Sequence, residues 1–322
     1  VLFGRKIRSD PRLPALSTAA PRIRAMRLVL LSAIVIGTFL TILNNREPLV
    51  YGPTFLPGMR PWDMLSLLGG YLLMTVPFFL AWKYMASPDA HRLFLKSLVV
   101  GALAYSLLML VEIRLSPQLH NWVYGYHQHS FAQHIRDGFR PMVFMQHGIW
   151  VGFFIFMSLL AAVGLWKAEH APKWILAATW LFAILFVSKN LGAFALGVVL
   201  LSIYIALWQR AQVWAVVAIA ILTLAYPALR QSQIVPIGGM VRAAALVSQD
   251  RAASLQFRID HEERLLARAA LKPWTGWGGW NREKIFTEWG KNVTISEGRW
   301  VQTLGHSGWI GYVGWFGLLT LP

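Results

Sequence analysis

Long apolar runs separated by short polar segments dominate the pattern of this chain. A helix that crosses the hydrocarbon core of a bilayer needs roughly 20 mostly apolar residues. Lipid offers backbone groups no water, so each run is expected to form an α-helix, and the pattern predicts an all-α, polytopic helical membrane protein. About eight transmembrane helices are expected, over residues 27–43, 64–85, 93–113, 142–166, 174–188, 191–208, 213–229 and 300–321.

Composition agrees with this pattern. The 322 residues are 56% hydrophobic and carry a net charge of +16, proportions that a chain crossing lipid repeatedly needs and a soluble domain could not cover. There are no cysteines, which excludes a disulfide framework and thiolate metal sites. Residues 1–25 lack the apolar core and cleavage site of a signal peptide, so the first run is expected to stay as an anchor. The chain has no initiator Met and stops inside an apolar run, so we expect a fragment truncated at its C-terminus.

Lys and Arg in the connections predict the orientation. Thirteen lie on the side of the N-terminus and six on the opposite side, outside the segment 230–299. Cytoplasmic loops carry the positive excess, so the N-terminus is expected in the cytoplasm. The predicted organisation is a cytoplasmic basic segment over 1–26, a bundle of seven helices over 27–229, a large extracytoplasmic loop over 230–299, and a last transmembrane helix over 300–322.

The predicted outer loop is strongly basic. Loops of this length are largely exempt from the topology rule, so its charge needs another cause. An anionic ligand, with phosphate the obvious choice, is one explanation; a solvated face or attraction to anionic headgroups is the other. Its eleven basic residues are Arg230, Arg242, Arg251, Arg258, Arg264, Arg268, Lys272, Arg282, Lys284, Lys291 and Arg299.

Helical spacing within this loop predicts a helix over 254–271, with Ser254 as N-cap and Pro273 ending it. Arg258 either pairs with Glu262 four residues on, or binds phosphate with its planar fork. Trp274, Trp277 and Trp280 follow among glycines, and suit either an interfacial aromatic belt or a platform on which sugars stack. Glu297 is expected at the outer surface, as a salt-bridge partner or a general base.

Other polar residues also face the predicted outside. His147 falls inside the run 142–166, where an ionisable group is a functional candidate and a neutral hydrogen-bonded His is the more common outcome. Lys189 lies in a turn on the predicted outer side. Snorkelling of its ammonium group to lipid headgroups is the simpler explanation of its position. A zinc site is not favoured at the histidines, which have no Cys or carboxylate partner nearby; these are His120, His127, His129 and His134.

Four segments together resemble landmarks of the O-antigen ligase and O-antigen polymerase superfamily. The likeness covers roughly residues 138–322, and the order and spacing of the segments agree with the family. They are GFRPMVFMQHGIWVGF, SKNLGAFALGVVLL, SLQFRIDHEERLLARAALKPWTGWGGW and EGRWVQTLGHSGWIGYVGWFGLLTLP.

The resemblance implies a metal-independent, cofactor-free glycosyltransferase of the bacterial inner membrane. It would transfer or polymerise glycan from an undecaprenyl diphosphate-linked donor onto a glycan acceptor, within a lipid bilayer and without nucleic acid. Arg258 matches the family arginine before the Pro-x-x-Gly-x-Gly turn, and Lys189 falls where the family often has an arginine. Arg140 and Arg264 are further candidate diphosphate ligands. Glu297 stands where ligases usually have a histidine, so the candidate bases are Glu297 and then His306.

Two other function classes fit the same sequence. A transporter or flippase for an anionic lipid-linked glycan is the first, although such proteins often contain internal repeats and no clear repeat is present here. A non-catalytic subunit that anchors an extracellular assembly is the second. Motifs for nucleotide binding, a nucleophile elbow or a His-Glu-x-x-His zinc site are absent from the sequence, which argues against energy from nucleotide hydrolysis within this chain.

Overall fold

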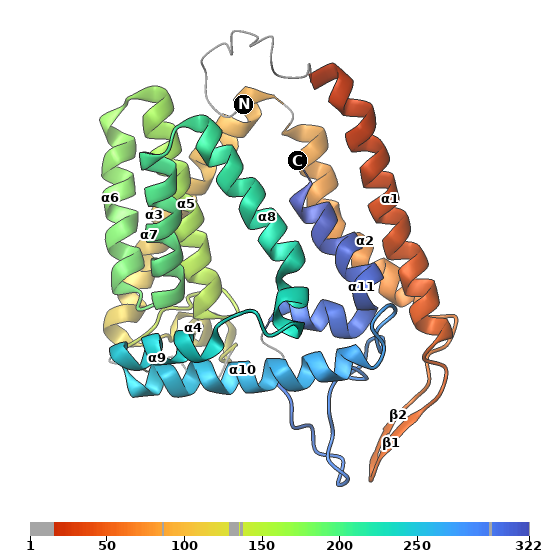
Figure 1. Ribbon diagram of the computed structural model, residues 1–322. Helices are drawn as coiled ribbons and strands as arrows, with labels where there is room; N and C mark the ends of the chain where they lie inside the picture. The colour runs from red at the N-terminus through yellow and green to blue at the C-terminus, as the bar shows by residue number, and fades with distance from the viewer. Residues whose placement is uncertain (1–15, 86, 129–134, 136–137, 296–297, 322) are drawn as a thin grey trace. The chain divides into compact units, whose positions relative to one another are not determined.

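The computed structural model of the chain describes residues 16–85, 87–128, 135, 138–295 and 298–321. These residues form the helices labelled in Figure 1 and one antiparallel hairpin. The elements are α1 (Leu16–Leu43), β1 (Leu49–Tyr51), β2 (Thr54–Leu56), α2 (Asp63–Tyr84), α3 (Pro88–Leu115), α4 (Leu119–Tyr124), α5 (Gly148–Glu169), α6 (Pro172–Val187), α7 (Leu191–Ala206), α8 (Gln209–Gln231), α9 (Ile237–Val247), α10 (Gln249–Ala270) and α11 (Arg299–Thr320).

The chain divides into two compact units, and each is described by itself. Unit 1 contains Pro77–Ala215, and unit 2 contains residues 16–76 together with 216–321. The chain therefore passes between units within α2 and within α8.

Five helices in the described part of the chain are long and apolar enough to cross a membrane. They belong to α1, α2, α3, α5 and α8. With 16 residues each, α6 and α7 are shorter than a full span, and α11 is broken at Gly308. The prediction of an all-α membrane protein is confirmed at this level, because the apolar helices need a lipid environment. The prediction of eight full-length spans is not confirmed.

Unit 1 is built around α5. This helix is apolar on all sides, and it packs against α3, α6 and α7 (Figure 1). Val151, Ile155 and Leu159 are almost completely buried in the resulting core. A helix that is hydrophobic all round must be covered by other helices or by lipid, and the buried residues of α5 show that other helices cover much of it.

In unit 2, α1 packs along α11, and α10 packs against both α9 and α11 (Figure 1). The first contact is close because α11 has glycine where the two helices meet. A Cβ on Gly314 would come within 2.8 Å of Ile34 Cγ1 and 3.2 Å of the Leu30 carbonyl oxygen. Small residues at helix crossings are typical of membrane proteins, in which close van der Waals packing drives association.

Two predicted helix starts are wrong. The run 142–166 was expected to be helical throughout, but α5 begins only at Gly148, because the amides of Met142 and Val143 donate to the side chain of Glu112. Ser254 is not an N-cap: α10 begins five residues earlier, at Gln249, after Ser248 in an extended conformation. Ala252 and Ala253 favour this extension, since alanine is the strongest helix former.

Candidate functional site

A loop is inserted into the break of α11. At Gly308 the backbone takes φ 60° and ψ −166°, a conformation essentially restricted to glycine, so the helical hydrogen-bond ladder is interrupted. The backbone of Trp274 and Thr275 fills the space where a side chain on Gly308 would lie. We call the segment 273–279 the insertion loop. Its backbone takes the place of some of the hydrogen-bond partners that an unbroken α11 would provide for itself.

Four backbone hydrogen bonds join the insertion loop to α11. The amides of Trp309 and Ile310 donate to the carbonyls of Pro273 and Trp274, at 2.7 and 3.3 Å. In the other direction, the amides of Trp277 and Gly278 donate to the carbonyls of Gly305 and His306, at 2.8 and 2.9 Å. Helix groups freed by the break are thus satisfied by protein, as buried backbone requires.

Helix α1 holds the loop from its other side. The hydroxyl of Thr41 donates to the carbonyl of Thr275 at 2.5 Å, and the side-chain amide of Asn45 donates to the carbonyl of Gly276 at 3.0 Å. Both side chains are buried. The sequence pattern had placed Thr41 in an ordinary apolar span, so it gave no indication of this contact.

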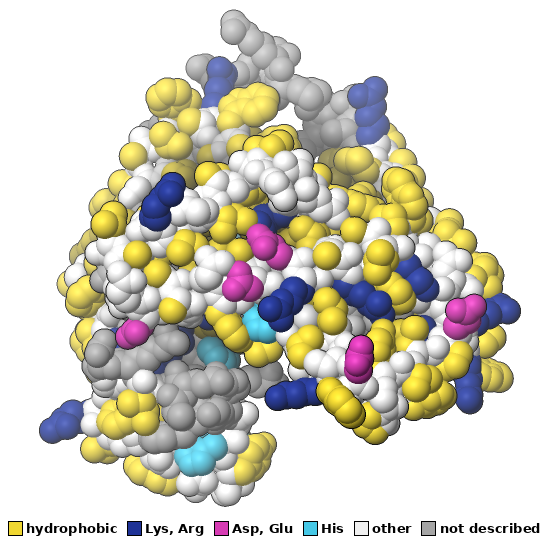
Figure 2. Space-filling view, turned by 60° about the horizontal axis from the view of Figure 1, so that its bottom comes forward, with side chains coloured by type: hydrophobic (Ala, Val, Ile, Leu, Met, Phe, Trp, Pro, Cys, Tyr) yellow, Lys and Arg dark blue, Asp and Glu magenta, His cyan; other side chains and the backbone are white. Residues whose placement is uncertain are grey.

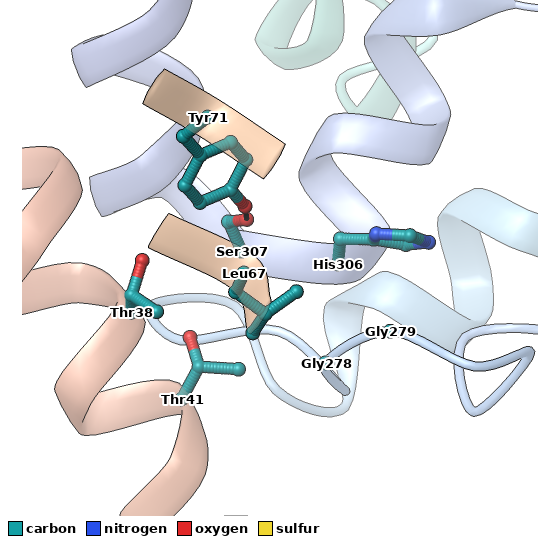
Figure 3. Close-up of a pocket in the computed structure, with 8 residues that line it drawn as sticks. All are labelled: Thr38, Thr41, Leu67, Tyr71, Gly278, Gly279, His306 and Ser307. Carbon is teal, nitrogen blue, oxygen red and sulfur yellow. Dashed lines mark hydrogen bonds between the residues drawn. The ribbon is translucent and has the colours of Figure 1, made fainter. Parts of the chain in front are cut away.

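A narrow pocket lies where α1, α2, α11 and the insertion loop meet (Figure 3). In it the hydroxyls of Tyr71 and Ser307 face each other and form a 3.0 Å hydrogen bond, while the ring of His306 points away from Thr38 and Thr41 (Figure 3). The space is too small for a water molecule. It is lined by Thr38, Thr41, Leu67, Tyr71, Gly278, Gly279, His306 and Ser307.

His306 is held by a buried carboxylate. Its Nε2 lies 3.2 Å from Oε1 of Glu283, whose side chain is only 6% exposed, whereas the histidine is 37% exposed. Burial raises the pKa of Glu283, but the hydrogen bond and the charge of His306 outweigh it, and the net pKa is lowered. A carboxylate on one ring nitrogen leaves the other, Nδ1, to exchange a proton with a substrate. The sequence analysis found His306 but missed Glu283, for which no motif gives a signal.

Two basic residues of the segment 230–299 donate hydrogen bonds mainly to the segment that follows α1. Arg282 is 2% exposed and donates to the carbonyls of Trp277, Pro57 and Glu47. Lys272 donates to the carbonyl of Asn44 and the side chain of Asn45. Part of the positive charge of the segment 230–299 therefore has a structural role.

The indole of Trp277 lies against two cations, Arg268 and Lys272. The guanidinium carbon of Arg268 is 3.4 Å from the ring centroid and Lys272 Nζ is 4.6 Å from it. Burial, and then the charges of the nearby arginines Arg282 and Arg268, lower the pKa of Lys272. Trp277 is only 8% exposed, whereas Trp274 and Trp280 are 67% and 49% exposed. Of the three tryptophans predicted to contact glycan, these two therefore present accessible rings.

Arg258 and Arg264 of α10 are exposed, whereas Ile259, Leu265 and Leu266 of the same helix are buried. The face shown in Figure 2 carries Lys and Arg side chains among hydrophobic and acidic ones. Glu297 lies outside the described residues, and so do His129 and His134. Within the described part of the chain there is no group of three or more metal-ligating side chains.

In unit 1 the structure brings Arg140 and Lys189 together. Arg140 donates through Nε, at 2.6 Å, and through Nη2 to the side-chain oxygen of Asn190, the residue after Lys189. Asn190 in turn donates to the carbonyl of Gly148 at 2.9 Å. Lys189 has φ 57°, and its ammonium group lies against Gly138, two residues before Arg140. Lys189 lies in the turn between α6 and α7, as predicted.

The predicted run that follows Arg140 does not begin as a helix, because α5 starts only at Gly148. The segment after it is held by Glu112, which is 1% exposed and accepts from the amides of Met142 and Val143 at 2.8 and 2.7 Å. Glu112 accepts a third bond from the amide of Leu119. A carboxylate inside an apolar run was overlooked in the sequence, although ionisable groups in spans are rare and usually have a specific role.

His147 is not within a span. It is the N-cap of α5, and its Nδ1 accepts from the amide of Ile149 at 3.0 Å. Side-chain capping of this kind satisfies a helix N–H that has no partner in the helix. This contact gives the histidine a structural role at the start of α5.

The fold and these contacts define a helical membrane protein with a polar, broken helix in unit 2 and a basic turn in unit 1. A scan against protein-family models gives no match, and neither the search of curated proteins nor that of solved structures finds a similar one.

Proposed function

We propose that this protein is an extracytoplasmic glycosyltransferase. It transfers or polymerises glycan from a polyprenyl diphosphate-linked donor onto a glycan acceptor, in the bacterial inner membrane, with the segment 230–299 outside the cytoplasm. The resemblance of four segments to the O-antigen ligase and polymerase superfamily motivates the proposal.

The observation that carries it is the meeting of Arg140 and Lys189 at one turn of unit 1. They come from distant parts of the sequence, and Lys189 is exposed. Two cations at the end of apolar helices suit a phosphorylated lipid, whose tail lies in the bilayer and whose head lies at its surface. On α10, Arg258 and Arg264 are further candidate ligands of the diphosphate.

The pair of Glu283 and His306 supplies the acid–base step. Nδ1 of His306 accepts the proton of the acceptor hydroxyl as its oxygen bonds to the anomeric carbon of the donor sugar. The bond from that carbon to the diphosphate breaks, and the diphosphate leaves with the electron pair. Fixed cations can stabilise the charge that develops on a diphosphate by several kcal/mol without a metal, and the candidates in the same unit as His306 are Arg258 and Arg264. Glu283 keeps the imidazole oriented and stabilises its protonated form.

The test uses purified protein in vesicles with lipid-linked repeat units, and resolves the glycan products by electrophoresis. Lys189→Ala should slow transfer by about tenfold or more, since a charge-assisted contact is lost. His306→Gln should slow it by about a hundredfold, the usual effect of losing a general base. Lys173→Ala, an exposed lysine at the opposite end of α6, is the matched control.

Arg258 is tested in the same assay. Arg258→Ala should abolish extension while the protein stays in the membrane, and Arg258→Lys should impair it because a point charge replaces the fork. Transfer at the wild-type rate by Lys189→Ala and Arg140→Ala together would remove the proposed diphosphate contact.

One observation favours a second candidate, a transporter or flippase of an anionic lipid-linked glycan. Broken helices with irregular backbone in the gap are frequent in transporters, and α11 with its insertion loop has this form. Vesicles loaded on one side distinguish the two. New glycosidic bonds without movement support the enzyme, and movement of the lipid-linked glycan without new bonds supports transport.

A further inference from the structure

A large open cleft in unit 2 lies apart from the narrow pocket of His306. It has a volume of about 850 Å³ and is formed by the end of α8, the turn that follows, the start of α9, and α10. Helices α9 and α10, which both contribute to its lining, lie side by side (Figure 1). Its polar lining consists of Arg230, Gln231, Gln233 and Glu263, and Leu266 and Pro273 are among its apolar residues. We call it the Arg230 cleft.

Arg230 is the unusual member of this lining. Its side chain is 3% exposed, and its Nη2 is buried without a hydrogen-bond partner. The nearest carboxylate oxygens, on Glu262 and Glu263, are 3.9 and 3.8 Å from the guanidinium nitrogens, which allows attraction but is too long for a hydrogen bond. A buried donor without a partner costs free energy, so a ligand that brings an oxygen to this nitrogen gains a contact that the protein itself lacks.

The lining selects the chemistry of that ligand. The positive charge of Arg230 is already offset by Glu263, and Glu262 adds a second carboxylate close to it. An anion would therefore meet as much repulsion as attraction. A molecule with many hydroxyl groups fits better, because hydroxyls both accept from Arg230 and the glutamine amides and donate to the carboxylate. Leu266 and Pro273 offer apolar surface to the C–H faces of sugar rings.

We propose that the Arg230 cleft binds a saccharide of several residues, with the guanidinium of Arg230 donating to a sugar hydroxyl. The inference rests on the proposed function, because the saccharide bound in the cleft would be a glycan that takes part in the transfer reaction. It names a site distinct from the cation pair of Arg140 and Lys189, and from the exposed rings of Trp274 and Trp280.

The absence of cysteine from the chain allows a direct test. Ala267 lines the cleft and is exposed, so a single cysteine introduced by Ala267→Cys reports on its occupancy through the rate of maleimide labelling. Ala253→Cys, at an exposed position of α10 outside the lining, is the control. The probe is the repeat-unit oligosaccharide, released by mild acid from the lipid-linked glycan that accumulates when the gene is deleted. Inorganic pyrophosphate is tested in parallel.

The oligosaccharide should slow labelling of the Ala267→Cys protein severalfold and leave the Ala253→Cys protein unchanged. Adding Arg230→Gln should raise the concentration needed for protection by about tenfold or more, whereas Arg242→Gln, an exposed arginine of α9, should not. Protection by pyrophosphate and not by the oligosaccharide would overturn the inference, because the cleft would then bind anions.

The failure of this inference can be separated from that of the proposed function. Each cysteine variant is also assayed for glycan transfer in vesicles. Normal transfer without protection at Ala267→Cys eliminates the saccharide cleft and leaves the glycosyltransferase proposal standing. Protection with neither transfer nor new glycosidic products supports the cleft and removes the enzyme.

Discussion

Gly308→Ala is the most direct test of the broken helix. Glycine at φ 60° and ψ −166° occupies a region that other residues enter only at a cost of about 1–3 kcal/mol. A Cβ at this position would also collide with the backbone of Trp274 and Thr275, which cannot move away as the end of a flexible side chain can. The variant must therefore either carry this strain or straighten α11 and expel the insertion loop.

Either outcome is costly. Expelling the loop breaks four backbone hydrogen bonds, of 2.7, 2.8, 2.9 and 3.3 Å, each with a net value of about 1 kcal/mol. We expect Gly308→Ala to lower the free energy of unfolding by about 2 kcal/mol or more, since retaining the break costs the strain and the collision with the loop, and expelling the loop costs its four hydrogen bonds.

The assay is thermal unfolding in detergent, followed by the loss of monodisperse protein on size-exclusion chromatography. Hydrogen exchange at residues 273–279 shows in addition whether the loop has left the helix. Gly70→Ala is the matched control, because Gly70 also lies in an apolar helix but has no atom within 4 Å of the added Cβ. This change should be neutral or slightly stabilising. Equal unfolding temperatures for the two variants would refute the argument that Gly308 is required by the break.

Three further changes test the contacts that hold the site. Arg282→Met should destabilise the protein by about 3 kcal/mol or more, since it leaves the backbone carbonyls of Trp277, Pro57 and Glu47 without this donor, and unfolding in detergent measures this. Glu112→Leu should cost a similar amount, because three amides lose their acceptor, with increased proteolysis of the segment after Arg140 as the readout. The pKa of Glu283 lies below its usual 4.5, so its stabilising contribution is complete above the pKa of the unfolded chain and is lost as pH falls through the lower folded value. Wild type and Glu283→Gln should therefore differ in unfolding temperature at about pH 6, and the difference should shrink as the pH falls below the usual carboxyl pKa.

The elements of the fold were largely predictable, because they depend on local periodicity and on the length of apolar runs. All eight predicted runs contain a helix, and α10 was expected near its observed place. What could not be predicted was the backbone that departs from the helix. The non-helical start of the run 142–166 depends on Glu112, a residue about thirty positions away, and the break in α11 depends on the insertion loop.

The candidate site was predictable only in part. Lys189 was placed correctly in its turn, and the positions of Arg258 and Arg264 on one helix were expected from spacing. The roles of Lys272 and Arg282 in holding backbone, and of Glu283 in holding His306, could not be predicted, because each partner is distant in the sequence and no motif joins them.

The sequence by itself determined that this protein is helical, apolar enough for a membrane and rich in basic residues along one segment, since these properties follow from composition and from the period of apolar positions. Only the tertiary structure decided which cations hold backbone, which meet at a turn, and which histidine has a carboxylate beside it. The reason is physical: a side chain's charge and hydrogen-bonding groups are fixed by its identity, but the partner that satisfies them is fixed by packing between segments far apart along the chain.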